Sequence, residues 1–147
     1  MSEAASSGER KSFWICLALL IIAVAGESLA DRELSDFRAD SANKGKVCDV
    51  GLWGVSRHPN YFFEWLGWLA YVIIAIDFTG AYPWGWLAFA GPLLMYWLLV
   101  HASGIPPLEA HMVRSRGKVF REYQQRVNAF WPGPQHTANA SNDGDIR

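Results

Sequence analysis

Three long apolar runs interrupt an otherwise polar chain of 147 residues. The first covers residues 13–25 and extends to residue 30, the second covers residues 62–76, and the third covers residues 84–100. Each run approaches the roughly 20 residues with which a helix crosses the hydrocarbon layer of a bilayer. The pattern predicts an all-α, multi-pass helical membrane protein with about three transmembrane helices. A cleaved signal peptide, with Arg10 and Lys11 as its basic start, is the alternative for the first run.

Polar and helix-breaking residues separate these runs. The first helix should continue through Leu34 and Phe37 and stop at Asn43-Lys44-Gly45. The second run ends at Asp77-Phe78-Thr79-Gly80, a cluster typical of turns. Pro92 should kink the third run, and the sequence Ser-Gly-Ile-Pro-Pro at residues 103–107 should end it.

The remaining segments complete the predicted organisation. Residues 108–127 are charged but compatible with helix, which predicts a cytoplasmic C-terminal amphipathic helix. Residues 1–11 and 135–147 are predicted to be disordered tails. The membrane domain is expected to cover residues 12–134.

Composition limits the possible functions. The formal net charge of −1 gives no reason to expect nucleic acid as a partner. The eight tryptophans gather near the ends of the apolar runs, where indole rings commonly anchor helices at membrane interfaces. Cys16 and Cys48 show neither metal-ligand spacing nor a disulfide pattern, so no metal site and two free thiols are expected.

The distribution of cations orients the predicted spans. If all three runs cross, residues 31–60 and the residues after His101 lie on the same side of the membrane. That side carries Arg32, Arg38, Lys44, Lys46, Arg57, Arg114, Arg116, Lys118, Arg121, Arg126 and Arg147. The positive-inside rule places it in the cytoplasm, in a bacterial inner membrane. We expect the two segments to form one basic pocket above the helices, although most of these charges are also explained as topology signals.

One stretch, residues 51–65, concentrates candidate chemistry at the start of the second run. Pro59 disfavours helix at His58 and fits the first turn of a helix, so a helix should begin around Asn60. Asn60 and Glu64 are then one turn apart and share a face. This arrangement places an amide and a carboxylate beside Arg57 and His58 at the mouth of an apolar helix.

The pocket has the side chains of a nucleotide-cofactor site. Arg38, Arg57, Arg114, Arg116 and Arg121 suit phosphate or carboxylate groups, and Tyr61, Trp65 and Tyr123 suit stacking on a flat ring. The glycine-rich phosphate-binding motifs are absent from the sequence. Structural explanations remain open for single members, such as a carbonyl-bound His58 or a Glu64–arginine ion pair.

Four stretches together resemble a known family. They are G-L-W-G-V-S-R-H-P-N-Y-F-F-E, D-R-E-L-S-D-F-R with Asn43 downstream, S-G-I-P-P-L-E, and R-E-Y-Q-Q-R-V-N-A-F-W-P. They are similar to the C-terminal domain of steroid 5-alpha-reductase-like membrane proteins, in particular to a bacterial, uncharacterised branch. The R-H-P-x-Y signature is more distantly similar to isoprenylcysteine carboxyl methyltransferases.

The resemblance implies a cytoplasm-facing NADPH pocket, with S-adenosylmethionine as the alternative cofactor. It assigns cofactor contacts to Asn60 and Glu64, to Asp31 and Arg38 by spacing, and to His111 and Arg114 as the nearest matches on the C-terminal helix. With the residues of the four stretches, the candidate cofactor-binding set is Asp31, Arg38, Asn43, Arg57, His58, Asn60, Tyr61, Glu64, Glu109, His111, Arg114, Arg121 and Tyr123.

The resemblance has one gap. Reductases of this kind carry their proton-donating tyrosine in helices that precede the matching region, and the sequence begins just before that region, so no catalytic residue is assigned. Either the sequence is a fragment, or another chain supplies these helices, or the protein catalyses no reduction. The expected function is NADPH-dependent reduction of a C=C bond in a lipid or steroid-like substrate. The alternatives are a methyltransferase acting on a lipidic substrate and a non-catalytic subunit. A second chain that supplies the missing helices is a possible partner, beside membrane lipids.

Overall fold

The computed structural model describes residues 2–76 and 82–137, and within them the chain is helical, with no strand. The α-helices are α1 (Ser2–Ala39), α2 (Pro59–Ala75), α3 (Ala90–Trp97) and α4 (Ile105–Arg126). Short 3-10 helices cover η1 (Ser41–Asn43), η2 (Gly51–Gly54) and η3 (Pro83–Phe89), and a π-helix, η4, covers Leu98–Ala102. The all-helical fold class predicted from the sequence is confirmed.

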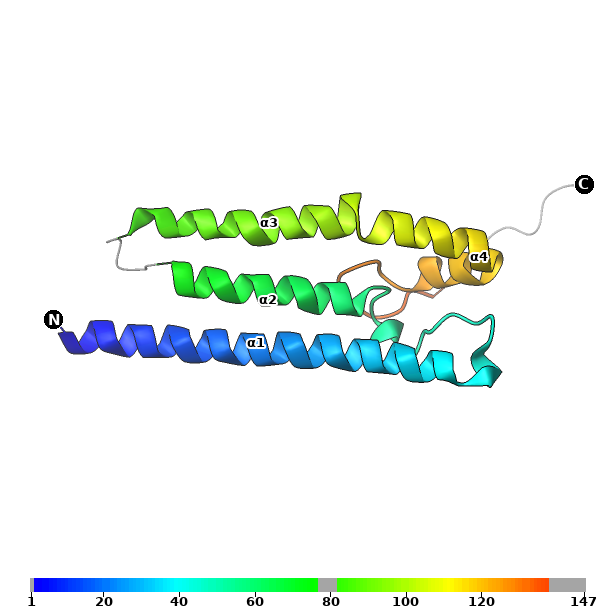
Figure 1. Cartoon of the computed structure of the whole chain (residues 1–147), viewed down its shortest axis with the longest axis horizontal. Coiled ribbons are helices and arrows are strands. Elements are labelled where there is room, and N and C mark those ends of the chain that lie inside the picture. The colour runs from blue at the N-terminus through cyan, green and yellow to red at the C-terminus, as the bar shows by residue number, and fades with distance from the viewer. Residues whose placement is uncertain (1, 77–81, 138–147) are drawn as a thin grey trace, which may run out of the picture.

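The helices divide the molecule into an apolar body and one polar end. Figure 1 shows α1, α2 and α3 lying side by side, with the N-terminus at one end of the body. Residues 40–58, α4 and the segment after it gather at the opposite end. The two long polar segments of the sequence therefore meet, as the three-run pattern predicts.

Small residues let α1 and α2 pack closely. Ala23, Ala30 and Ala70 are at most 3% exposed. A Cβ atom at Gly26 would lie 2.4 Å from the ring of Phe63, so only glycine fits at this crossing without displacing that ring. Small residues at helix contacts are the usual means by which apolar helices approach each other.

The third apolar run changes helix type instead of kinking at Pro92. The 3-10 helix η3 precedes α3, so Pro92 falls in the first turn of the α-helix, where a proline lacks no intrahelical hydrogen bond. The run is nearly straight in Figure 1 up to η4. The kink predicted at Pro92 is therefore wrong, because the helix that would bend starts two residues before it.

The third run ends at Ser103-Gly104, as predicted, and a second break in the C-terminal half lies at Gly117. This residue has φ 52° and ψ −119°, a backbone conformation that glycine adopts at little cost. It divides α4 into two parts and turns the second part back toward the first (Figure 1). Glu109 and Gln124, 15 residues apart, meet for this reason, whereas a straight helix would separate them by about 22 Å.

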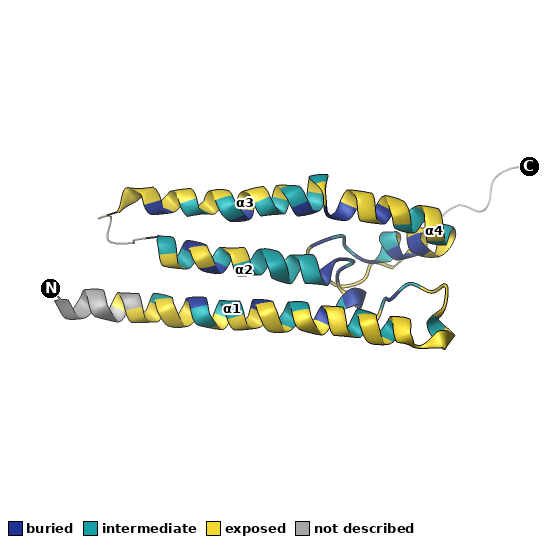
Figure 2. Ribbon diagram, in the orientation of Figure 1, coloured by how far each residue is buried: buried dark blue, intermediate teal, exposed yellow. Residues whose placement is uncertain are grey.

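Within the described residues, two segments are long and apolar enough to cross a membrane: Arg10–Ala39 and Pro83–Arg126. Apolar side chains remain exposed along the body (Figure 2), among them Ile22 at 54% and Leu93 at 67%. Helix α2 has 17 residues, about the minimum for a span. Length and exposed apolar surface thus support a membrane protein.

Both predicted tails differ from expectation within the described residues. Helix α1 begins at Ser2, because no proline separates the N-terminal residues from the apolar helix that follows. Gln135 and His136 are held by hydrogen bonds, the amide of Gln135 to the carbonyl of Gly54 and the backbone of His136 to that of Arg126. Residues 77–81, which include the whole of the predicted turn, and residues 138–147 lie outside the described residues.

Candidate functional site

The turn that precedes α2, residues 51–58, is fixed onto α1; we call it the His58 turn. Gly51 has φ 57°, and a Cβ there would overlap the carboxylate of Glu33. That carboxylate accepts the backbone N–H of Leu52 at 2.9 Å. The indole N–H of Trp53 donates to the carbonyl of Ala30 at 2.8 Å. These contacts set the direction in which the chain enters α2.

Pro59 starts α2, which confirms the boundary predicted from the sequence. His58 is the N-cap, with φ −136°, and Pro59 is the first helical residue. The backbone N–H of His58 donates to Ser56 Oγ at 3.2 Å, and Ser56 Oγ donates to the carbonyl of Phe130 at 2.9 Å. His58 is 4% exposed, so this polar side chain is held inside the protein.

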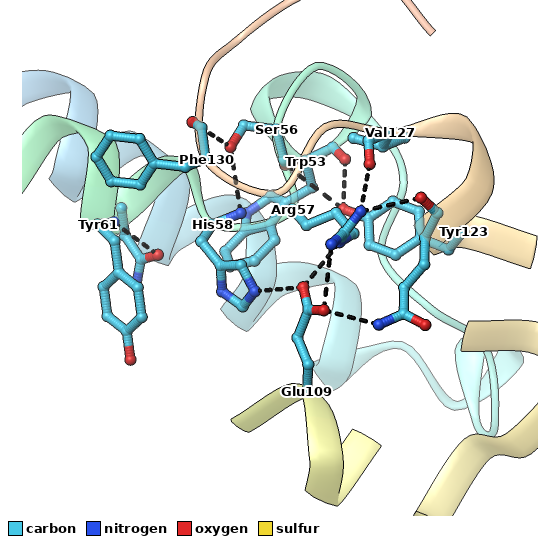
Figure 3. Close-up of polar contacts among 11 residues, drawn as sticks. Trp53, Ser56, Arg57, His58, Tyr61, Glu109, Tyr123, Val127 and Phe130 are labelled. Atoms are coloured by element: carbon cyan, nitrogen blue, oxygen red, sulfur yellow. Dashed lines mark hydrogen bonds and ion pairs between the residues drawn. The ribbon is translucent and has the colours of Figure 1, made fainter. Parts of the chain in front are cut away.

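A buried carboxylate, Glu109 of α4, collects the polar side chains around this turn (Figure 3). The guanidinium of Arg57 donates from Nε to Oε1 at 2.7 Å and from Nη2 to Oε2 at 3.1 Å. His58 Nε2 lies 2.9 Å from Oε1, and Gln124 Nε2 donates to Oε2 at 2.7 Å. We call these four residues the Glu109 network.

The network keeps Glu109 ionised. Burial by itself raises the pKa of this carboxyl, but the hydrogen bonds from His58, Arg57 and Gln124 outweigh it and lower the pKa from 4.5 to about 2. Arg57 also donates from Nη1 to the carbonyls of Gln124 at 3.0 Å and Val127 at 2.6 Å. Its hydrogen-bonding capacity is therefore used largely within the protein.

Tyr123 locks the second part of α4 beneath the His58 turn. Its hydroxyl donates to the carbonyl of Trp53 at 2.6 Å, and its side chain packs with Phe120 and Val127 in the buried core of this end. Tyr123 is 2% exposed, and its burial raises the pKa of the phenol. The ring is an interior support and offers no open face for stacking.

The segment after α4, residues 127–136, runs back along the His58 turn; we call it the C-terminal strap. The backbone N–H of Arg57 donates to the carbonyl of Asn128 at 2.8 Å, and that of Gly133 donates to the carbonyl of Val55 at 2.9 Å. Arg126, where α4 ends, pairs with Asp49 at 3.1 Å. Residues 49–57 are thus held between α1, α4 and the strap.

Three cavities meet at this polar end. An outer cavity of about 290 Å³ and a side cavity of about 560 Å³ open toward solvent, and a smaller, partly open cavity of about 110 Å³, here called the inner cavity, adjoins them. Arg38 and Met112 line all three, so the cavities are contiguous. Lys44 and Arg116 line both open cavities, and His58 and Asn60 line the inner one. The basic pocket expected between the two polar segments is therefore present.

The structure sorts the predicted cofactor-binding residues into two groups. Seven line the cavities: Arg38, Asn43, Arg57, His58, Asn60, His111 and Tyr123. The other six do not appear in the lining of these three cavities: Asp31, Tyr61, Glu64, Glu109, Arg114 and Arg121. Arg57 and Tyr123, although they line a cavity, are engaged by the contacts given above.

Several residues of the second group support the first. Asp31 accepts a hydrogen bond from the side-chain amide of Asn60 at 3.2 Å, and the ring of Tyr61 stacks on His58 with centroids 5.5 Å apart. Glu64 lies near Glu27 of α1, and the two carboxylates repel each other. The ion pair between Glu64 and an arginine, which the sequence left open, is thus not what surrounds Glu64 on the side of α1. Arg114 and Arg121 are exposed on α4.

The predicted cofactor-binding set lacks several lining residues, among them Lys44, Met112 and Arg116, although Lys44 and Arg116 were expected in the basic pocket. A signal for two of them is present in the sequence. Glu109, Met112 and Arg116 follow the spacing i, i+3, i+7, which places them on one face of a helix. Asn43, a predicted cofactor-binding residue, lines the outer cavity, and its amide also donates to the carbonyl of Phe37 at 3.0 Å.

Comparison with known proteins gives one match, to the model of a family described as a protein of unknown function, DUF1295, over residues 3–127. The chain belongs to the DUF1295 family. No curated protein and no solved structure matches it. The match covers α1 to α4 and thus every element that forms the His58 turn, the Glu109 network and the three cavities.

We predict that Glu109→Gln destabilises this DUF1295 protein by about 3–5 kcal/mol, because it leaves the buried Arg57 guanidinium without its counter-charge. The free energy of unfolding of this variant should also lose the part of its pH dependence that Glu109 contributes. Since the pKa of Glu109 is lower in the folded chain, its contribution is complete above pH 4.5 and disappears as the pH falls toward 2. Unfolding in mild detergent at several pH values measures both effects.

Glu122→Gln is the matched control, because Glu122 forms an exposed pair with Lys118 at 3.8 Å. Its loss should change the free energy of unfolding by no more than about 0.5 kcal/mol. Equal destabilisation by the two substitutions, or an unchanged acid response in Glu109→Gln, would contradict the role of the Glu109 network.

Proposed function

We propose that this protein is a membrane-embedded, NADPH-binding domain that takes part in the reduction of a C=C bond in a lipidic substrate. The observation that carries the proposal is the continuity between two open, cation-lined cavities and an inner cavity that reaches His58 and Asn60. DUF1295 is associated with steroid 5-alpha-reductase-like proteins, which supports the same assignment.

The cations at the open cavities suit a phosphorylated ligand. Arg38 is exposed and makes no ion pair within the described residues, so its charge is available to a ligand. Lys44, His111 and Arg116 surround the same side cavity. Guanidinium groups bind phosphate oxygens in a bidentate manner, and a lysine adds a mobile positive charge. This donor set fits the phosphate groups of a dinucleotide.

The inner cavity supplies groups of a different kind. His58 and Asn60 line it together with the apolar side chains of Leu108 and Phe120. Because Glu109 holds Nε2 of His58, Nδ1 is the ring nitrogen through which His58 would exchange a proton or a hydrogen bond with a bound molecule. Arg57 and Tyr123 act as supports of this cavity in the proposal, in place of the ligand contacts expected from the sequence.

NADPH, when bound, supplies the hydride for such a reduction. The chain's own residues bind and orient: Arg38 and Arg116 hold phosphate, Asn60 offers an amide, and the Glu109 network fixes His58. Leu108, Met112 and Phe120 give the inner cavity an apolar lining. S-adenosylmethionine has no phosphate groups, so the open basic cavities favour the dinucleotide over the methyl donor.

Arg38→Ala should weaken binding of NADPH by about 1.5–3 kcal/mol if the guanidinium meets the additional ribose phosphate. NADH, which lacks that phosphate, should lose much less. Arg121→Ala, which removes an exposed arginine of α4 outside the three cavities, should leave both affinities unchanged. Calorimetric titration in mild detergent measures the affinities of the unmodified chain and of both variants for NADPH and NADH.

Equal losses for the two nucleotides would remove Arg38 from this role. Binding of S-adenosylmethionine without binding of NADPH would favour the methyltransferase, and binding of neither would favour a non-catalytic subunit.

We further propose that α1, α2 and the third run cross a bacterial inner membrane with the polar end in the cytoplasm. Ser41 is exposed at the polar end, and Trp84 is 65% exposed at the other. In intact cells, an impermeant thiol reagent should label Trp84→Cys but should reach Ser41→Cys only after permeabilisation. Cys16 and Cys48 are buried and give a low background. Labelling of Ser41→Cys in intact cells would show that the polar end lies outside the cytoplasm and would contradict the proposed orientation.

A further inference from the structure

An apolar groove of about 280 Å³ lies between α2 and the third run, on the body of the molecule. Trp65 and Leu69 line it from α2, and Leu93 and Tyr96 line it from α3. Trp131 of the C-terminal strap completes the lining. The groove shares no lining residue with the three polar cavities.

The surface of this groove is apolar throughout. The indole N–H of Trp65, which could otherwise bind a ligand, donates to the carbonyl of Pro92 at 2.9 Å. A polar group placed here would lose its hydrogen bonds to water without replacement. The groove therefore accepts hydrocarbon and excludes a head group.

The orientation of its rings favours a linear chain over a flat ring system. The rings of Trp65 and Trp131 meet at 82°, those of Trp65 and Tyr96 at 62°, and those of Tyr96 and Trp131 at 36°, so no two of these rings are parallel. Walls at steep angles surround a chain from several sides, whereas a steroid nucleus is held best between parallel faces. Leu93, at 67% exposed, forms part of the rim, so the groove opens sideways onto the apolar surface of the body.

The groove is built together with the polar site. Phe62, Trp65 and Leu69 follow one face of α2, which begins directly after His58, and Trp65 lies about 10 Å along the helix axis from His58. Phe62 bridges the interval, because its ring contacts that of Trp131 with centroids 6.0 Å apart. The C-terminal strap, which carries Trp131, is itself joined to the His58 turn by the backbone hydrogen bonds of Arg57 and Gly133. A molecule seated in the groove thus has a fixed position relative to His58.

We propose that this groove holds the linear hydrocarbon chain of a membrane lipid, with the head group of that lipid at the level of His58. The inference rests on the proposed function, because it names the site that would bind the chain of the lipidic substrate. It narrows the substrate class from lipid or steroid-like molecules to lipids with a linear chain.

The test uses a long-chain fatty alcohol that carries a photoreactive diazirine at its terminal carbon, with the full chain purified in mild detergent. Crosslinks mapped by peptide mass spectrometry should concentrate on the groove residues of α2 and α3. Leu93→Trp narrows the groove and should lower this labelling about tenfold, since losing the burial of two methylene groups already has that effect. Leu94→Trp is the matched control, because Leu94 is 57% exposed on the same helix but outside the lining.

Competition on the unmodified chain supplies a second readout that requires no variant. An unlabelled fatty alcohol should displace the probe, and a flat steroid should not. Even labelling around the outward faces of α1 and α3, equal loss in both variants, or displacement by the steroid instead of the alcohol would overturn the proposal. NADPH binding, measured on the same samples, separates the two claims: nucleotide binding without groove labelling contradicts the groove, and groove labelling without nucleotide binding contradicts the proposed function.

Discussion

One buried carboxylate holds the polar end of this molecule together. Glu109 comes from the first part of α4, and its partners come from the His58 turn and from the second part of α4. A buried charge with fewer partners would be costly, so the four side chains must be in place together. The bend at Gly117 allows these side chains to meet, because the bend brings Gln124 back to Glu109, which lies 15 residues earlier in the chain. Two of the residues that bond to this carboxylate, Arg57 and His58, also line the inner cavity.

This arrangement joins two surfaces of opposite character. On one side, Arg38, Lys44 and Arg116 line solvent-accessible cavities suited to phosphate. On the other, Trp65 and Trp131 line a groove suited to hydrocarbon. His58 links the two surfaces, because it lines the inner cavity and directly precedes α2, one face of which continues into the groove. A protein that brings a water-soluble cofactor to a membrane lipid requires this combination.

Much of this end could be predicted from local sequence signals. The proline rule gave the start of α2 at Pro59, and the turn predicted at Asn43-Lys44-Gly45 is present, with Gly45 at φ 84°, although α1 itself already ends at Ala39. The meeting of the two polar segments could be predicted from the number of apolar runs, because three crossings place both segments on the same side of the membrane. These features depend on neighbouring residues or on the number of crossings, and neither needs knowledge of side-chain contacts.

The partners within the site could not be predicted in the same way. Gly117 lies in a charged, helix-compatible stretch whose pattern is also that of a continuous helix, so the bend and the Gln124–Glu109 contact have no local signal. Arg57 has the residue type of a phosphate ligand, and only the fold shows that Glu109 and two carbonyls engage it. The groove depends on the strap, which carries Trp131 to α2 across a long interval of sequence.

The central claim is that the contact between Arg57 and Glu109 couples the His58 turn to α4. A double-mutant cycle with Arg57→Ala and Glu109→Ala, read as the free energy of unfolding in mild detergent, tests it most directly. The account predicts a coupling energy of about 2–3 kcal/mol, the upper part of the range for residues in contact. Additive losses, with a coupling energy below about 0.5 kcal/mol, would show that the two residues stabilise the protein independently and would contradict the account.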